Sequence, residues 1–282
     1  MGPPEIIRWV LSKRARSLVY CPSMPQKSHS PLSRQPLSVV IIAKNAATQL
    51  AACLESASFA DEILVVDSGS SDGTAELAAQ RGARVVQKEW LGFGRQKQFA
   101  VEAAQHDWVL CLDADERVSE ALRASILEAL NAPVAQAYAM SRCNRFMGRW
   151  LRHGEGYPDW SLRLFDRRHA RWSDDPVHEK VLADVPVARL TGDLLHDSAE
   201  TLAGYLDKQN RYTSMQAEAL FQAGKRAGVA QLLLSPLLRF VKFYVLRLGF
   251  LDGLPGLIHI LIGCQNSFAK YAKMLAFQAH KQ

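Results

Sequence analysis

Hydrophobic and polar positions along residues 37–131 follow two alternating patterns. Continuous apolar runs, "LSVVIIA", "ILVV" and "WVLCL", predict strands that are buried on both faces. Between them, apolar residues recur at helical spacing, and these segments predict helices over 46–58, 71–82, 95–105 and 119–132, the last capped by Ser119. Strands that alternate with helices of this length indicate βαβ units and a parallel sheet.

The pattern changes after Pro133. Strands are predicted over 137–148 and 160–168, joined by a loop rich in Gly, Tyr, Trp and His. A helix is predicted over 199–223, and it leads into an apolar, basic C-terminal region. The sequence therefore predicts three parts: a leader over 1–35, an α/β domain over 36–198 and a helical extension over 199–282.

Composition excludes several classes of protein. The five cysteines are scattered without a CxxC pair, which favours a reducing compartment and argues against a disulfide framework or a zinc knuckle. Residues 1–36 carry six Lys/Arg against Glu5, and residues 225–282 carry eight against Asp252. Basic ends on a more acidic body do not fit a nucleic-acid binder, but they fit a body held against an anionic surface.

The two ends of the chain are the segments that could contact a membrane. Residues 1–35 are rich in Pro and Ser and predict a disordered basic leader without the apolar core of a secretory signal. In the extension, 228–238 is too short to span a bilayer, and 253–269 is interrupted by polar residues. Apolar stretches with Lys and Arg favour interfacial helices that lie in the headgroup layer, although a helical pair docked on the domain is the alternative.

Polar residues follow three of the predicted strands: Ala43-Lys44-Asn45, Asp67-Ser68-Gly69-Ser70 and Asp113-Ala114-Asp115-Glu116. In open α/β sheets, ligands bind outside the carboxyl ends of the strands. Two carboxylates two residues apart can share Mg²⁺ or Mn²⁺ together with a diphosphate. Each stretch alone also has the composition of an ordinary turn or helix cap, so the combination carries the hypothesis.

The segments "LSVVIIAKN", "DEILVVDSGSSDGT" and "WVLCLDADERV" resemble the nucleotide-sugar half of the family 2 glycosyltransferases, over about residues 37–131. The later segments "GRQKQFA", "YPDWSLRLFDRR" and "VHEK", with the C-terminal region, are similar to the lipopolysaccharide-core glucosyltransferase branch, which adds a sugar to the inner-core heptose. The resemblance implies the inverting GT-A fold, a mixed and mainly parallel sheet with helices on both faces, followed here by the helical extension.

The resemblance also implies site residues. Those for the nucleotide sugar are Asn45, Asp67, Ser68, Lys97, Asp113 and Ala114, and those for the metal are Asp115 and Asp113. Asp67 would accept a hydrogen bond from the uracil or ribose, and Asp115 would bind Mg²⁺ or Mn²⁺. Lys97 would contact the diphosphate, and a solvated lysine on a helix face is its alternative.

The general base is the least defined part of the site. Many family members place it in a Glu-Asp pair after the metal motif, and this sequence lacks that pair. The candidates are Asp159 in "YPDW" and Glu179 in "VHEK", of which Asp159 is favoured because it precedes a strand among aromatic residues. A Pro-Asp turn is its alternative. Glu179 and His178 could instead position the acceptor or the diphosphate, and Arg163 could pair with an anionic donor or form a surface salt bridge.

These features predict an inverting, metal-dependent hexosyltransferase. Its donor would be a UDP-sugar, with UDP-glucose implied by the resemblance, and its acceptor a lipid-anchored oligosaccharide of the lipopolysaccharide inner core. It would act as a peripheral protein on the anionic cytoplasmic face of the inner membrane. One alternative is a non-catalytic, membrane-bound relative acting as an adaptor. Another is a phosphatase with a DxD nucleophile, disfavoured because that motif normally follows the first strand.

Overall fold

Three apolar runs that the sequence predicts as strands form the middle of the main sheet in this computed structural model, which describes residues 34–175, 179–198 and 201–279. They are β1 (Leu37–Ala43), β2 (Glu62–Asp67) and β4 (Trp108–Asp113), and β3 (Arg84–Gln87) completes the order β3-β2-β1-β4. All four strands are parallel. Their carboxyl ends therefore meet at one edge of the sheet.

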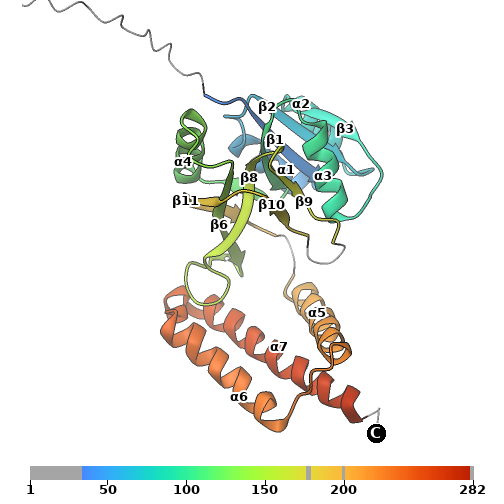
Figure 1. Cartoon of the computed structure of the whole chain (residues 1–282), viewed down its shortest axis with the longest axis vertical. Coiled ribbons are helices and arrows are strands. Elements are labelled where there is room, and N and C mark those ends of the chain that lie inside the picture. The colour runs from blue at the N-terminus through green and yellow to red at the C-terminus, as the bar shows by residue number, and fades with distance from the viewer. Residues whose placement is uncertain (1–33, 176–178, 199–200, 280–282) are drawn as a thin grey trace, which may run out of the picture. The chain divides into compact units, whose positions relative to one another are not determined.

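The second half of the sheet is largely antiparallel and continues in the order β4-β8-β6-β11-β5. It consists of β8 (Asp159–Asp166), β6 (Ala137–Phe146), β11 (Val187–His196) and β5 (Glu116–Val118). The short β7 (Arg149–Trp150) pairs with β6, while β9 (Ala170–Trp172) and β10 (Val181–Ala183) form a separate ribbon. The predicted fold class, a mixed sheet with a C-terminal helical extension, is confirmed (Figure 1).

The acidic segment after β4 differs from the prediction. The sequence pattern predicts polar residues after the strand but not a second strand directly behind them, whereas the chain turns at Ala114 and Asp115 and continues as β5. The Glu116 carboxylate accepts a hydrogen bond from the Asp113 backbone N–H at 3.0 Å, which stabilises the turn. Glu116 then begins β5, which pairs with β11 at the far end of the sheet order.

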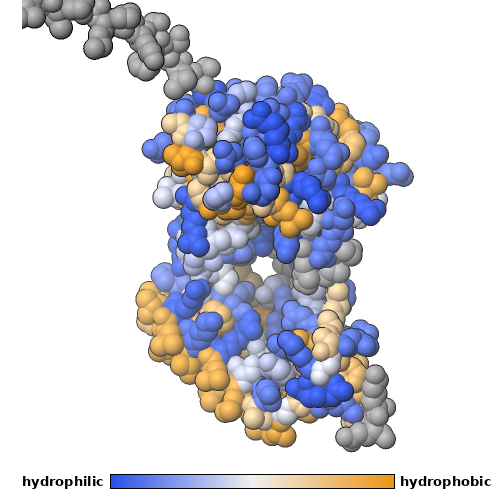
Figure 2. All heavy atoms as spheres, viewed as in Figure 1, coloured by the Kyte–Doolittle hydropathy of each residue, from blue (hydrophilic) through white to orange (hydrophobic). Residues whose placement is uncertain are grey.

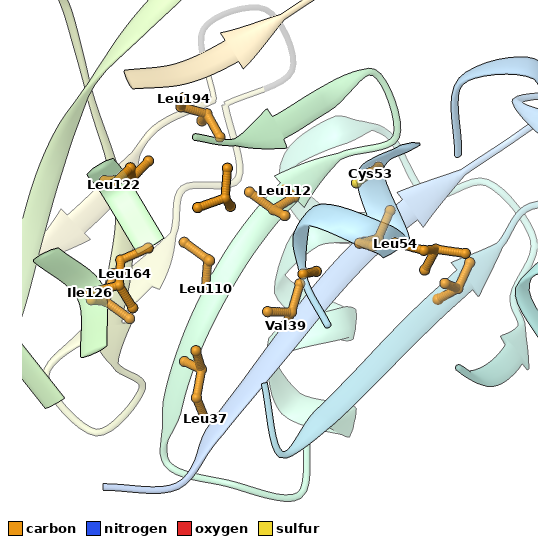
Figure 3. Packing of buried hydrophobic residues seen from close by; sticks show 14 of the residues in the cluster. Leu37, Val39, Cys53, Leu54, Leu110, Leu112, Leu122, Ile126, Leu164 and Leu194 are labelled. Carbon is orange, nitrogen blue, oxygen red and sulfur yellow. The ribbon is translucent and has the colours of Figure 1, made fainter. Parts of the chain in front are cut away.

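Helices cover both faces of the sheet. On one face lie α1 (Ala47–Ser56), α2 (Thr74–Gln80) and α4 (Glu120–Asn131), and on the other lies α3 (Phe93–Ala103). Alternate strand residues serve the two cores: Figure 3 shows Val39 and Leu110 among the residues of the first cluster, with Leu122 and Ile126 of α4. The predicted cap of α4 is confirmed, since Ser119 Oγ accepts from Leu122 N at 3.3 Å.

The extension consists of three long helices. They are α5 (Leu202–Gln222), α6 (Val229–Phe240) with a wider helical turn η2 (Val241–Leu246), and α7 (Gly253–Ala279) after the short η3 (Gly249–Asp252). Helix α7 packs against both α5 and α6 (Figure 1). The loop before β8 holds the extension: Arg239 forms an ion pair with Glu155, and the N–H groups of Arg152 and His153 donate to Asp252 Oδ2 at 3.0 and 2.8 Å.

Helix α6 and η2 form one continuous apolar segment, Val229–Leu246. By length and composition it could cross a membrane, the single such segment in the described part of the chain. The sequence-based prediction counts only residues 228–238, which are followed by Arg239 and Lys242. In the structure the helix continues through η2 to Leu246. None of this segment is buried: Leu233 is 61% exposed and Leu238 65%. Figure 2 shows the resulting hydrophobic surface along α6.

Candidate active site

A cleft of about 570 Å³ opens where β1 and β4 end. The loop after β1 contributes Lys44 and Asn45, and the turn after β4 contributes Asp113, Ala114 and Asp115. Charged side chains and one histidine from other elements also line it: Lys97, Glu179, His196 and Lys208. The volume suits a nucleotide-sized ligand, and the position is the usual ligand site of open α/β sheets.

Asp113 lies in a buried network of charges. Its carboxylate is 3.0 Å from Lys97 Nζ and 3.1 Å from Arg163 Nη2. Burial alone would raise the pKa of Asp113, but Arg163 and Lys97 outweigh burial and hold that pKa well below its usual range. Burial raises the pKa of Glu116, against the opposing effect of Arg163, whose Nη2 is 3.0 Å away. Asp113 is therefore ionised at neutral pH.

Lys97 and Arg163 are both buried and both face the cleft region. The Lys97 side chain is 7% exposed, with Nζ 3.4 Å from Glu179 Oε1 and 4.7 Å from the centre of the Trp172 ring. Lys97 is therefore not a solvated lysine on a helix face, although its contact to a diphosphate stays a prediction. Arg163 is not part of a surface salt bridge, and its Nη1 has no hydrogen-bond partner among the described residues.

Asp115 lies beside a histidine that the sequence analysis missed. His196 Nε2, at the end of β11, is 3.2 Å from Asp115 Oδ2, and His196 Nδ1 is 2.7 Å from Asn144 Oδ1. With Nδ1–H donating to Asn144, Nε2 is directed at Asp115, an orientation common for metal-binding histidines. The signal was available: the polar pair His196-Asp197 follows an apolar strand, as the other site residues do.

The donor set fits a weakly held Mg²⁺ or Mn²⁺. No group of three or more His, Cys, Asp or Glu residues ready to hold a metal occurs within 34–175, 179–198 and 201–279. Asp115 and His196 are two candidate ligands that line the cleft. Mg²⁺ in phosphate-binding sites commonly takes one or two protein ligands and completes its shell with substrate phosphates and water. Asp113, held by Lys97 and Arg163, is less available as a ligand.

Asp67 and Ser68 lie behind the cleft lining, not in it. Asp67 is fully buried; its Oδ2 accepts from Gly69 N at 3.1 Å and Ser70 N at 3.0 Å. Asn45 adopts a left-handed conformation, φ 51°, and its Oδ1 accepts from Ser71 N at 2.9 Å. Asp67 and Asn45 thus stabilise the turn after β2 and link it to the loop after β1, which lines the cleft. The contact of Asp67 with a base or ribose stays a prediction.

A second cavity of about 440 Å³ adjoins the first and holds both candidate bases. Asp159 and Glu179 line it together with Trp160, Lys97 and Asp113. Asp159 is 37% exposed, and Arg142 Nε donates to its Oδ2 at 3.0 Å. Glu179 also lines the first cleft. His178 and the leader residues 1–33 lie outside the described residues.

Comparisons with known proteins agree with this geometry. The family model "Glycosyl transferase family 2" matches residues 38–182. The lipopolysaccharide core biosynthesis glycosyltransferase LpsC of Rhizobium meliloti is 32% identical over 257 residues, 88% of this chain and 94% of that protein. An uncharacterized glycosyltransferase of Rickettsia typhi is 29% identical over 84% of this chain and 86% of its own length.

A solved structure supports the fold over nearly the whole chain. The mannosyltransferase PcManGT from Pyrobaculum calidifontis, in complex with GDP-Man and Mn²⁺, matches with a TM-score of 0.50 at 18% identity. The match covers 87% of this chain and 88% of that one. The likeness extends beyond the part that the family model matches, and at this identity it concerns the fold alone.

Proposed function

The chain belongs to glycosyl transferase family 2, and from this premise we propose that it is an inverting, metal-dependent hexosyltransferase acting on the lipopolysaccharide inner core. The proposed donor is UDP-glucose. The match to LpsC over 94% of that protein supports the acceptor class. The observation that carries the proposal is the turn at Asp113–Asp115, which presents carboxylates beside Lys97 and His196 at the edge of a nucleotide-sized cleft.

The two adjoining cavities suggest how the donor lies. The nucleotide would occupy the first cleft, beside Asn45 and Ala114, and the hexose the second, beside Trp160. Asp115 and His196 would hold the divalent ion, which when bound stabilises the negative charge of the departing diphosphate. The unpartnered Arg163 Nη1, buried next to Asp113, offers a donor that a ligand oxygen could satisfy.

The reaction requires one proton acceptor. The acceptor hydroxyl oxygen forms a bond to the anomeric carbon of the sugar as the bond from that carbon to the diphosphate breaks on the opposite face. UDP leaves with the electron pair, and the hydroxyl proton passes to a carboxylate. We assign this role to Asp159, because it lines the second cavity and pairs with Arg142, which also lines a third cavity. Glu179 is held by Lys97 on the diphosphate side.

Calorimetric titration of UDP, with and without Mn²⁺, tests the donor site. Wild-type protein should bind UDP in a metal-dependent manner, Asp115→Ala should lose that dependence, and Asp184→Ala, an exposed aspartate away from the cleft, should behave as wild type. Equal metal dependence in Asp115→Ala and wild type would refute the metal role of Asp115. Metal-dependent UDP binding without transfer from UDP-glucose to a core oligosaccharide would instead support a non-catalytic relative.

We also propose that the protein is peripheral on the cytoplasmic face of the inner membrane, with the α6–η2 segment in the headgroup layer. Its exposed leucines lie beside the exposed cations Lys242 and Arg247, while Asp252, the one acid in 225–282, is buried. The ion pair of Arg239 with the Glu155 loop favours a helix that lies on the membrane over one that crosses it.

Vesicle flotation separates the two arrangements. The protein should float with vesicles that contain anionic phosphatidylglycerol, float less with pure phosphatidylcholine, and be released from cell membranes by alkaline carbonate. Resistance to carbonate would indicate a spanning helix, and failure to float with either vesicle would refute membrane binding.

A further inference from the structure

A third cavity, of about 800 Å³, lies between the α/β domain and the extension. The ends of β6 and β11 form one wall, β11 through His196 and β6 through Arg142, Asn144, Arg145 and Phe146. Tyr205 of α5 and His259 of α7 belong to the opposite wall. We infer that this cavity binds the acceptor through an anionic sugar that carries a carboxylate or a phosphate, an inference that rests on the proposed function.

The cavity is connected to both parts of the donor site. Asp115, His196 and Lys208 line it together with the first cleft. Arg142 lines it together with the second cavity, where it pairs with Asp159. A sugar bound here would therefore present its hydroxyl groups next to both the proposed base and the proposed position of the diphosphate. That arrangement is required of an acceptor and not of a further donor group.

The charged residues that line the cavity favour an anion, because Arg142, Arg145 and Lys208 outnumber Asp115 and Asp197. Two guanidinium groups share Asp197: Arg145 Nη1 at 2.7 Å and Arg117 Nη2 at 3.4 Å. One carboxylate thus balances two cations. Arg145 is 41% exposed and can turn its remaining N–H groups to a ligand. A planar guanidinium binds carboxylate or phosphate through two parallel hydrogen bonds.

Aromatic rings form the part of the cavity nearest the extension. The Phe146 ring lies 5.5 Å from that of Tyr205 and 5.3 Å from that of His259. Tyr205 Oη and His259 Nε2 are 3.3 Å apart. Burial lowers the pKa of His259, and the nearby Arg239 lowers it further, so the ring is neutral at physiological pH. Aromatic surface with neutral polar atoms at its edge suits the faces and hydroxyl groups of a sugar ring.

Calorimetry with a deacylated inner-core oligosaccharide, added to protein saturated with UDP and Mn²⁺, tests the inference without relying on turnover. Three forms of the oligosaccharide separate the sources of charge: untreated, with carboxylates reduced to alcohols, and with phosphates removed by hydrogen fluoride. Arg145→Gln should weaken binding of the untreated form about tenfold, the effect of losing one hydrogen bond to a charged group. The treated form that wild type and Arg145→Gln bind equally well identifies the anion.

Two controls make the result specific. Arg149→Gln changes an exposed arginine on the neighbouring β7 that does not line the cavity, and it should leave the affinity unchanged. Tyr205→Ala should weaken binding severalfold, whereas Tyr212→Ala, on the same helix and outside the cavity lining, should not. Equal losses for charged and neutralised oligosaccharides, no loss in Arg145→Gln, or no binding by wild type would overturn the inference. Loss of UDP binding in every protein would instead refute the proposed function.

Discussion

The α/β domain and the helical extension depart from the usual distribution of residues in opposite directions. The domain buries charge: Arg163, Glu116 and Lys97 are each less than a tenth exposed. The extension exposes apolar side chains, and no residue of α6 is buried. Buried charges and large exposed apolar patches both cost stability, so each marks a surface that meets something other than water. We propose that this partner is an anionic ligand in the domain and a lipid surface in the extension.

Removal of the central cation should produce the largest effect. Arg163→Leu would leave Asp113 and Glu116 without their shared partner, and breaking a buried pair costs about 3–5 kcal/mol. The free energy of unfolding, measured in denaturant, should fall by this amount. Arg171→Leu, a change of an exposed arginine on β9, should cost less than about 0.5 kcal/mol. A small loss in Arg163→Leu would show that the charge cluster relaxes when the cation is removed.

A leucine-to-alanine substitution should cost more stability in the buried domain than on the exposed face of the extension. Leu110→Ala, in a fully buried strand position, should cost about 2–5 kcal/mol of unfolding free energy. Leu233→Ala on α6, where the side chain is 61% exposed, should stay within about 0.5 kcal/mol. Both values come from denaturant unfolding. Similar losses at the two positions would mean that α6 is covered by protein in solution.

Charge placed on the exposed face should abolish the proposed membrane contact. Leu234→Glu with Leu238→Glu removes two apolar side chains worth about 1.5–3 kcal/mol each on burial, so vesicle affinity should fall by more than about tenfold. UDP affinity should not change. The control is Tyr212→Glu, which places the same charge at an exposed position on α5. Unchanged flotation of the double variant would place the contact elsewhere on the chain.

The smallest expected effect is a loss of stability at low pH through the buried carboxylate of Glu62. Burial alone would raise the pKa of Glu62, but hydrogen bonds from Ser38 Oγ, Gln105 N–H and Arg84 lower it below 4.5. A lowered carboxyl pKa contributes stability that is complete above 4.5 and is lost as pH falls through the folded-state value. In that pH window, the free energy of unfolding of wild type should therefore fall more steeply with decreasing pH than that of Glu62→Gln. Parallel curves for the two proteins would contradict this.

Sequence patterns predicted the parallel half of the fold because its signals are local. Each strand, such as Leu37–Ala43, carries its own apolar run, and their polar ends converge once the strands are parallel. The pairing of β5 with β11 joins residues about 80 positions apart, and no local pattern reports it. His196 and Asp197 gave a local signal at the end of an apolar run, but only the folded sheet brings His196 to Asp115. The burial of Arg163 likewise depends on Asp113 and Glu116, which are distant in sequence.

The two-residue turn of Ala114 and Asp115 has a consequence for how the chain tolerates changes in length. Asp113 is paired with Ile42 on β1, and Glu116 is paired with His196 on β11, so two ladders fix both ends of the turn. An inserted residue would either break one ladder or move β5 by one position, which exchanges the faces of Glu116 and Arg117. Surface loops generally tolerate insertions and deletions during evolution. At this turn, a change in length would disrupt the site even if every site residue were kept.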